Sequence, residues 1–163
     1  MKIIDNFLEP IHFDDIKNTL TSLNFPWYYE NSSDHGEDDN PQMIHVFYDT
    51  FLPHKVNSPT YINLFNPVLE KLKVFSLIRI KANLTFKSNK KSSFHTDYLK
   101  VKKCKSAILY LNTNDGGTQF EKDFVKAKEN RIVIFSTDKK HRAVRSQENQ
   151  GRFVVNINYY EMI

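Results

Sequence analysis

His95 and Asp97, two residues apart, are the residues of this sequence whose types and spacing could do chemistry. On an extended strand, side chains at positions i and i+2 leave the same face of a sheet. An imidazole and a carboxylate held side by side are two of the three protein ligands that an open metal site needs. The spacing therefore predicts an incomplete metal site, which a residue elsewhere in the chain must complete.

His141 is the best candidate for the third ligand. It follows a predicted strand and the charged turn at residues 137–140, and it opens the next strand. Two imidazoles and one carboxylate on one face of an octahedral metal leave three positions open, which is typical of non-haem Fe(II) oxygenases, while catalytic zinc remains an alternative. Any of the remaining histidines could have an ordinary structural or surface role: His12, His35, His45 and His54.

The last predicted strand, residues 152–160, carries an arginine and two amides on one face. Alternation places Arg152 on the same face as Val154, Asn156 and Asn158. If this face lines a barrel interior, Arg152 is a buried cation, and a carboxylate bound bidentately is its natural partner. The alternative is that Arg152 lies on a solvated face.

Tyr110 lies on the predicted strand at 106–112, where it shares a face with Ser106, Ile108 and Asn112. Its hydroxyl could reach the same anion as Arg152. The spacing is equally compatible with Tyr110 packing in the core.

The spacing of apolar residues predicts helices at 12–23 and 60–73, the second N-capped by Ser58 and kinked or divided by Pro67. Beyond residue 74 the period becomes alternating. Seven or eight short strands separated by turns are typical of an antiparallel barrel or jelly roll. We therefore expect a mainly β fold in one domain, residues 1–163, with a helical N-terminal part at about 1–73 and a β-barrel core at about 74–160.

Composition is that of an ordinary globular protein. With 163 residues, 40% hydrophobic and 26% charged, the chain can bury one core and does not resemble a disordered or low-complexity sequence. The single cysteine, Cys104, excludes an internal disulfide framework and indicates a reducing compartment. The first residues lack a signal-peptide pattern and no apolar run approaches a membrane span, so we expect a cytoplasmic protein without membrane contact.

The net charge of +4 is distributed unevenly. Seven lysines lie between residues 87 and 105, where Asp97 is the only acid, and four more basic residues lie at 139–145 around His141. Such runs are either solvated faces or a basic rim that steers an anionic substrate. The polar loop at 31–41 is likewise either a surface loop or a substrate-covering lid.

His95, Asp97, His141 and Arg152, in this order, resemble the 2-oxoglutarate- and Fe(II)-dependent dioxygenases, in their prolyl-4-hydroxylase-like branch. The likeness covers about residues 79–160 and includes the run at 107–112 and the glycine turn at 116–118. The stretches at 4–8 and 79–84 are similar to small single-domain members, including ones carried by bacteriophages. A bacterial cytoplasm, or the host cytoplasm for a phage protein, is the corresponding location.

The resemblance implies a double-stranded β-helix, or jelly roll, with flanking N-terminal helices. It implies Fe(II) bound by His95, Asp97 and His141, and 2-oxoglutarate held by Arg152 and Tyr110. O2 would be the oxidant, with ascorbate in support, and succinate, CO2 and a hydroxylated substrate would be the products. Two further residues are expected near the co-substrate or in its pocket: Asn156, where such enzymes often place a hydroxyl residue, and Asn83.

The sequence leaves the substrate open. A protein side chain such as proline is one candidate, and an oxygenase of nucleic acid or of a small molecule is another, with nucleic acid not favoured. The rival from a different class is a non-catalytic jelly-roll module that binds an anionic ligand. Metal-dependent hydrolysis lacks a clear general base, and the oligomeric state is not indicated.

Overall fold

The computed structural model describes residues 1–32, 40–97, 103–148 and 151–162. In these residues ten strands form two antiparallel sheets, which confirms the mainly β prediction. The seven-stranded sheet has the order β1 (Lys2–Ile4), β8 (Arg131–Ser136), β5 (Lys105–Tyr110), β10 (Arg152–Glu161), β4 (Val74–Thr85), β3 (Gln42–Asp49) and β2 (Tyr28–Glu30). The three-stranded sheet has the order β7 (Phe124–Lys126), β6 (Gly117–Phe120) and β9 (His141–Val144).

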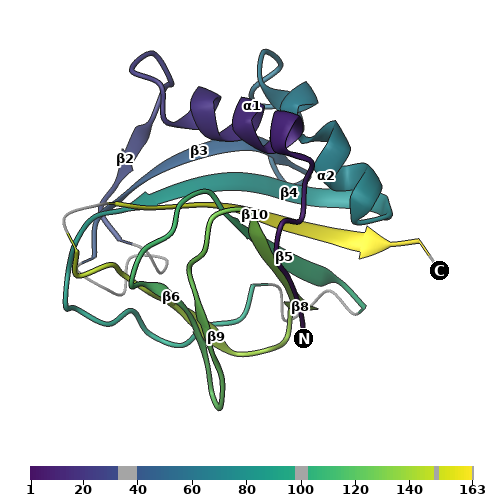
Figure 1. Cartoon of the computed structure of the whole chain (residues 1–163). Helices are drawn as coiled ribbons and strands as arrows, with labels where there is room; N and C mark the ends of the chain where they lie inside the picture. Colours follow the sequence, from purple (N-terminus) through teal and green to yellow (C-terminus); the bar gives the residue numbers. More distant parts are fainter. Residues whose placement is uncertain (33–39, 98–102, 149–150, 163) are drawn as a thin grey trace.

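The large sheet is the middle layer of the molecule. Helices α1 (Pro10–Leu20) and α2 (Asn66–Lys71) and the 3₁₀ helix η1 (Ile62–Phe65) cover one face, and β6 and β9 lie on the other side (Figure 1). One buried cluster joins the helices to the sheet, and a second lies on the side of the small sheet. The central strands β5 and β10 are therefore buried on both faces, as a sheet covered on both sides requires. No helix in the described ranges is long and apolar enough to cross a bilayer.

Strand β4 shows the predicted alternation, with one face buried and the other lining a cavity. Ile78, Ile80 and Ala82 are buried, whereas Arg79 and Lys81 line a cavity on the opposite face. In the antiparallel register with β10, Arg79 is opposite Asn158, Lys81 is opposite Asn156, and Thr85 is opposite Arg152. The polar faces of the two central strands therefore form one continuous surface.

Three local predictions about the helices and β4 were wrong. The first helix ends at Leu20, and Leu23, predicted in its buried stripe, is fully exposed. Phe86, expected at the end of the first alternating run after residue 74, lies one residue beyond β4 and is 46% exposed. Ser58 does not cap a helix, because its hydroxyl bonds to a histidine ring.

Pro67 acts as predicted at the division of the second helical region. η1 ends at Phe65 and α2 begins at Asn66, with Pro67 in the first turn. Proline is tolerated there because its missing N–H would have no intrahelical partner.

His45 on β3 is a structural histidine rather than a ligand. Its Nδ1 donates to the Pro26 carbonyl at 2.7 Å, so its Nε2 accepts from the Ser58 hydroxyl at 2.8 Å. The ring is 3% exposed and packs among Phe25, Phe47 and Tyr61. Burial lowers the pKa of His45 below its ordinary value of 6.5, so the neutral ring is the form that fits the core.

We predict that His45 makes the fold sensitive to acid. Below pH 6.5 the unfolded chain takes up a proton that the folded ring resists, so the free energy of unfolding should fall as the pH drops through the window between 6.5 and the lowered pKa of His45. His45→Leu should cost about 1–3 kcal/mol at neutral pH, because it leaves the Ser58 hydroxyl and the Pro26 carbonyl unpaired, but should show a shallower pH dependence. Urea denaturation at pH 7.5 and 5.5 measures both, with the exposed His12→Leu as the control. Equal slopes for His45→Leu and wild type would contradict the assignment.

Candidate metal site and its cavity

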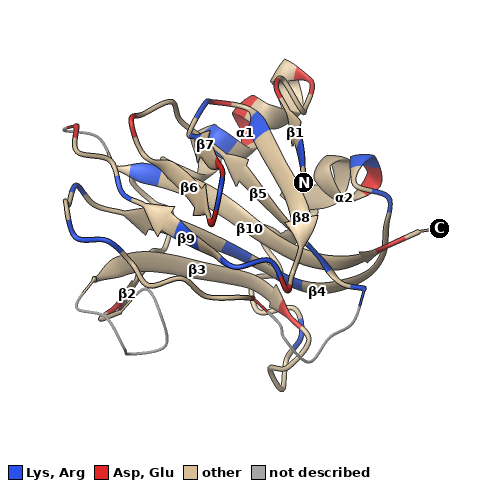
Figure 2. Ribbon diagram, turned by 90° about the horizontal axis from the view of Figure 1, so that it is seen from below, with Lys and Arg blue, Asp and Glu red and all other residues tan. Residues whose placement is uncertain are grey.

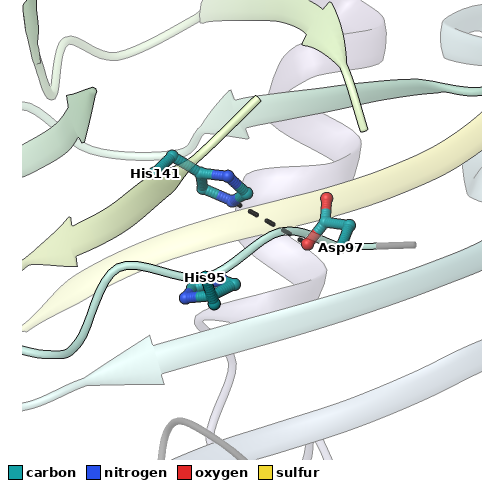
Figure 3. Close-up of side chains that lie close together, drawn as sticks. All are labelled: His95, Asp97 and His141. Atoms are coloured by element: carbon teal, nitrogen blue, oxygen red, sulfur yellow. Dashed lines mark ion pairs between the residues drawn. The ribbon is translucent and has the colours of Figure 1, made fainter. Parts of the chain in front are cut away.

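His95, Asp97 and His141 come together on one side of the large sheet. His141 begins β9, whereas His95 and Asp97 lie in an irregular segment after β4 and not in a strand as predicted. Their potential ligand atoms all lie within 4.8 Å of one another. Figure 3 shows the three side chains grouped together, with the Asp97 carboxylate facing the His141 ring.

The backbone brings the two segments together. His95 N–H donates to the His141 carbonyl, and His141 N–H donates to the His95 carbonyl, each at 2.9 Å. Two residues after His95, Asp97 N–H donates to the Thr137 carbonyl at 3.2 Å. This isolated bridge gives His95 and Asp97 strand-like support although no full strand forms.

Both histidine rings present Nε2 as the available ligand atom. His141 Nδ1 lies 3.0 Å from the Lys139 carbonyl, and His95 Nδ1 lies 3.4 Å from the Ser93 carbonyl. A carbonyl oxygen can only accept, so each Nδ1 carries the proton and each Nε2 keeps its lone pair. His141 Nε2 is 3.8 Å from Asp97 Oδ1. Burial lowers the pKa of His141, partly offset by Asp97, which favours the neutral imidazole that binds metals.

Asp97 is fixed by two side chains that the sequence did not single out. The Ser106 hydroxyl and the Asn158 amide, the latter at 3.0 Å, both donate to Asp97 Oδ2. Arg79 Nε donates to Asn158 Oδ1 at 3.2 Å, which fixes the orientation of that amide. Burial acts to raise the pKa of Asp97, but His141, Ser106, Arg79 and Asn158 outweigh it and lower the pKa. Asp97 is therefore an oriented carboxylate with Oδ1 left toward His141.

A cavity of about 360 Å³ runs from these three residues to Arg152. Arg152 is 3% exposed and makes a long contact of 3.4 Å to Thr118 Oγ1. Its Nε has no hydrogen-bond partner, and no acid in the described part of the chain pairs with it. Burial lowers the pKa of this guanidinium, yet arginine remains charged at neutral pH. An uncompensated buried cation is costly, and a carboxylate entering the cavity would supply the missing partner.

Tyr110 lies behind Thr118 rather than in the cavity wall. Its hydroxyl is 2.7 Å from Thr118 Oγ1, and its ring centroid is 5.5 Å from the Arg152 guanidinium carbon. Burial raises the pKa of Tyr110, so the hydroxyl stays protonated. Thr118, which the sequence analysis missed, is the hydroxyl that lines the cavity beside Arg152.

Asn83 and Asn156 both line the same cavity. Asn83 Nδ2 donates to Gln42 Oε1 at 3.0 Å. The Asn156 side-chain oxygen is buried without a hydrogen-bond partner, as is the Thr85 hydroxyl next to Arg152 in register. Contact of Asn83 or Asn156 with a co-substrate stays a prediction.

Asn112 holds the beginning of β10 and thus the position of Arg152. Its Nδ2 donates to the Gly151 carbonyl at 2.7 Å, and its Oδ1 accepts from Phe153 N–H at 3.1 Å. These bonds grip the residues on either side of Arg152. The sequence pattern places Tyr110 and Asn112 on one face of a strand, but the residues that this face contacts are known only from the structure.

Several lysines of the two basic runs are exposed, which fits both a solvated face and a basic rim, so the rim stays a prediction. Lys87, Lys91 and Lys140 are exposed, and Figure 2 shows Lys and Arg segments on β9 and on the loops near it. Arg142 on β9 stacks over Phe94, with its guanidinium carbon 4.5 Å from the ring centroid. Lys100 and Lys102 lie outside the described residues, as does most of the loop at 31–41 that was considered as a lid.

We predict that Ser106→Ala lowers metal affinity without unfolding the protein. The hydroxyl orients a ligand carboxylate, and loss of such a supporting bond typically costs about 10–100-fold in metal affinity. Anaerobic titration with Fe(II) measures the change. Ser136→Ala is the matched control, since Ser136 is an exposed serine at the end of the neighbouring strand β8, opposite Lys105. Equal affinities for Ser106→Ala and the control would show that Asp97 does not need this support.

The sequence matches no protein-family model and no curated protein. Solved structures nevertheless share the fold, among them the following three. A 2OG-Fe(II) oxygenase family oxidoreductase from Burkholderia pseudomallei has TM-score 0.69 and 13% identity, over 96% of this chain and 84% of that one. A Trichoplax adhaerens prolyl hydroxylase, in complex with a peptide fragment of hypoxia inducible factor, has TM-score 0.64 and 15% identity, over 98% and 83%. A Pseudomonas putida prolyl-4-hydroxylase has TM-score 0.56 and 12% identity, over 99% and 92%. The chain therefore has the jelly-roll fold of the 2-oxoglutarate- and Fe(II)-dependent oxygenases, prolyl hydroxylases among them, as the resemblance predicted.

Proposed function

We propose that this protein is an Fe(II)- and 2-oxoglutarate-dependent dioxygenase that hydroxylates an organic substrate. The observation that carries the proposal is the pairing of two features in one cavity. One end has two imidazoles and one carboxylate within ligand reach of one another. The other end has a buried arginine that pairs with no acid among the described residues. A dicarboxylic 2-oxo acid satisfies both ends at once.

Different residues would bind the Fe(II) ion and the 2-oxoglutarate. His95 Nε2, His141 Nε2 and Asp97 Oδ1 would hold Fe(II), an open set of two nitrogens and one oxygen suited to that metal. Arg152 would bind the distal carboxylate, with the Thr118 hydroxyl beside it and the Tyr110 hydroxyl supporting Thr118 from behind. When bound, the iron supplies the oxidation by O2 that converts 2-oxoglutarate to succinate and CO2 and a substrate C–H to C–OH. The side chains of Asp97 and His141 are each 4% exposed, so these two ligands are largely shielded from solvent.

A protein side chain such as proline is the proposed substrate class. Support comes from the peptide-bound prolyl hydroxylase that shares the fold. The basic rim suits an anionic partner, which could equally be an acidic peptide or, less favoured, nucleic acid. We further propose that residues 1–163 act as one domain in the cytoplasm, with ascorbate supporting turnover.

We predict that purified protein with Fe(II), ascorbate and labelled 2-oxoglutarate forms succinate slowly even without substrate, and that His95→Ala abolishes this reaction. Removing one imidazole leaves an iron site with two protein ligands. His54→Ala is the matched control because His54 is exposed in a loop away from the cavity. Metal binding without succinate under any condition would instead favour the non-catalytic anion-binding module. That rival also predicts unchanged 2-oxoglutarate affinity in Asp97→Ala.

We predict that Arg152→Met weakens 2-oxoglutarate binding about 100-fold, because a bidentate charged contact is lost in a buried site. Anaerobic calorimetric titration of 2-oxoglutarate into the Fe(II)-loaded protein measures this. Fe(II) affinity should change little, since Arg152 contacts none of the three metal ligands. Arg131→Met is the control for loss of an arginine, because Arg131 lies on β8 and forms an ion pair with Asp5. Wild-type affinity in Arg152→Met would refute the assigned role.

A further inference from the structure

The cavity has a second polar wall, apart from the three metal ligands and Arg152. It is built by β2, β3 and β4, on the side of the large sheet away from β5. Four of its residues form a connected set: Glu30, Gln42, Lys81 and Asn83. We refer to these four residues as the polar wall.

The hydrogen bonds of the polar wall have a fixed direction. The Glu30 carboxylate can only accept, so Gln42 must turn its Nε2 toward it, at 2.7 Å. Gln42 Oε1 then faces Asn83, which must donate through Nδ2 at 3.0 Å. The side-chain oxygen of Asn83 is consequently the end of the relay that remains for a ligand. Gln42, 3% exposed, bonds to both neighbours and so fixes the orientation of the Asn83 amide.

Lys81 is a largely buried ammonium in the polar wall, and its burial is energetically unfavourable. Its side chain is only 16% exposed, and its one partner is Glu30 Oε2 at 3.3 Å. Burial is the main reason that the pKa of Lys81 is lowered. An ammonium has three donors, so two remain without a protein partner, and Glu30 Oε1 is also without one in the described residues. A purely structural ion pair gains little from such an incomplete arrangement.

The polar wall lies beside both functional ends of the cavity. Along β10, Asn156 is opposite Lys81, between Asn158 at the Asp97 end and Arg152 at the other end. The Lys81 ammonium reaches across β3 to Glu30 on β2. Its head therefore lies to the side of the line that joins the metal ligands to Arg152, where a second molecule can approach.

We propose that Lys81, Glu30 and Asn83 form a subsite for the head group of the substrate, an α-amino carboxylate. The substrate carboxylate accepts from Lys81, and its nitrogen donates to Glu30 Oε1 and to the Asn83 side-chain oxygen. This inference rests on the proposed oxygenase function. The same carboxylate is carried by a free amino acid, whose ammonium can donate to both of these oxygens, and by the C-terminal residue of a peptide, whose single amide N–H can donate to only one of them.

The test uses the full chain with Fe(II) and 2-oxoglutarate in the absence of O2. The twenty L-amino acids, each as the free form, the N-acetyl form and the carboxamide, are titrated by calorimetry. At least one amino acid should bind with its carboxylate free, and its carboxamide should bind at least about tenfold more weakly, because a charged hydrogen bond is lost. Preference for the free form over the N-acetyl form identifies a free amino acid, and equal binding identifies a peptide C-terminus.

Variants assign the effect to residues. Lys81→Met should remove the preference for carboxylate over carboxamide, and Lys81→Arg should retain it. Glu30→Gln should weaken binding of the free ammonium form more than of the N-acetyl form. Lys105→Met is the matched control, because Lys105 pairs with Glu161 across two strands outside the cavity and should bind as wild type does.

Two results would overturn the subsite: no amino acid binding in any of the three forms, or Lys81→Met retaining the carboxylate preference. The proposed function is tested separately by succinate formation without substrate. Its failure with intact amino-acid binding would reject the oxygenase and keep the subsite, and the converse result would do the opposite.

Discussion

The pair of backbone hydrogen bonds between His95 and His141 is the contact on which the rest of the site depends. The two residues are 46 positions apart and belong to different segments, one irregular and one at the start of β9. Both bonds are 2.9 Å long and form in opposite directions, so the segment that carries His95 and Asp97 is held as if it were a strand of the small sheet. Without this bridge, nothing in the backbone would hold the two imidazoles toward a common point or place Asp97 beside Ser106 and Asn158 on the large sheet.

Strand β10 is the other organising element. One face of it packs toward the helices with Val155, Ile157 and Tyr159, all fully buried. The opposite face carries Arg152, Asn156 and Asn158 into the space between the sheets. Burying so many polar groups is costly unless each is paired. At the metal end Asp97 Oδ2 is paired within the protein, whereas Asp97 Oδ1 and Nε2 of both histidines remain open. The Arg152 end and the polar wall also keep open donors and acceptors, and these open atoms are the ones that await a ligand.

Sequence reasoning succeeded where one-dimensional spacing carries the information. The order of His95, Asp97, His141 and Arg152, together with the alternation on the last strand, indicates the fold. It failed where the outcome depends on a partner far along the chain. The periodicity that suggested a helix to Leu23 continued past the point where the core ends at Leu20. Ser58 has the sequence context of an N-cap, yet its hydroxyl is used by His45 on β3. Ser106 and Thr118 had no local feature to distinguish them from ordinary strand residues.

The sequence by itself determined the residue types capable of holding a metal and a carboxylate, the β-rich class of the fold and the polar face of β10, because these follow from composition and from the two-residue period of a strand. Only the tertiary structure decided that His95 meets His141, that Asn158 and Ser106 orient Asp97, and that Glu30 and Gln42 share a wall with Lys81. These contacts depend on strand order and register, which bring together residues far apart in the sequence and therefore cannot be read from local spacing.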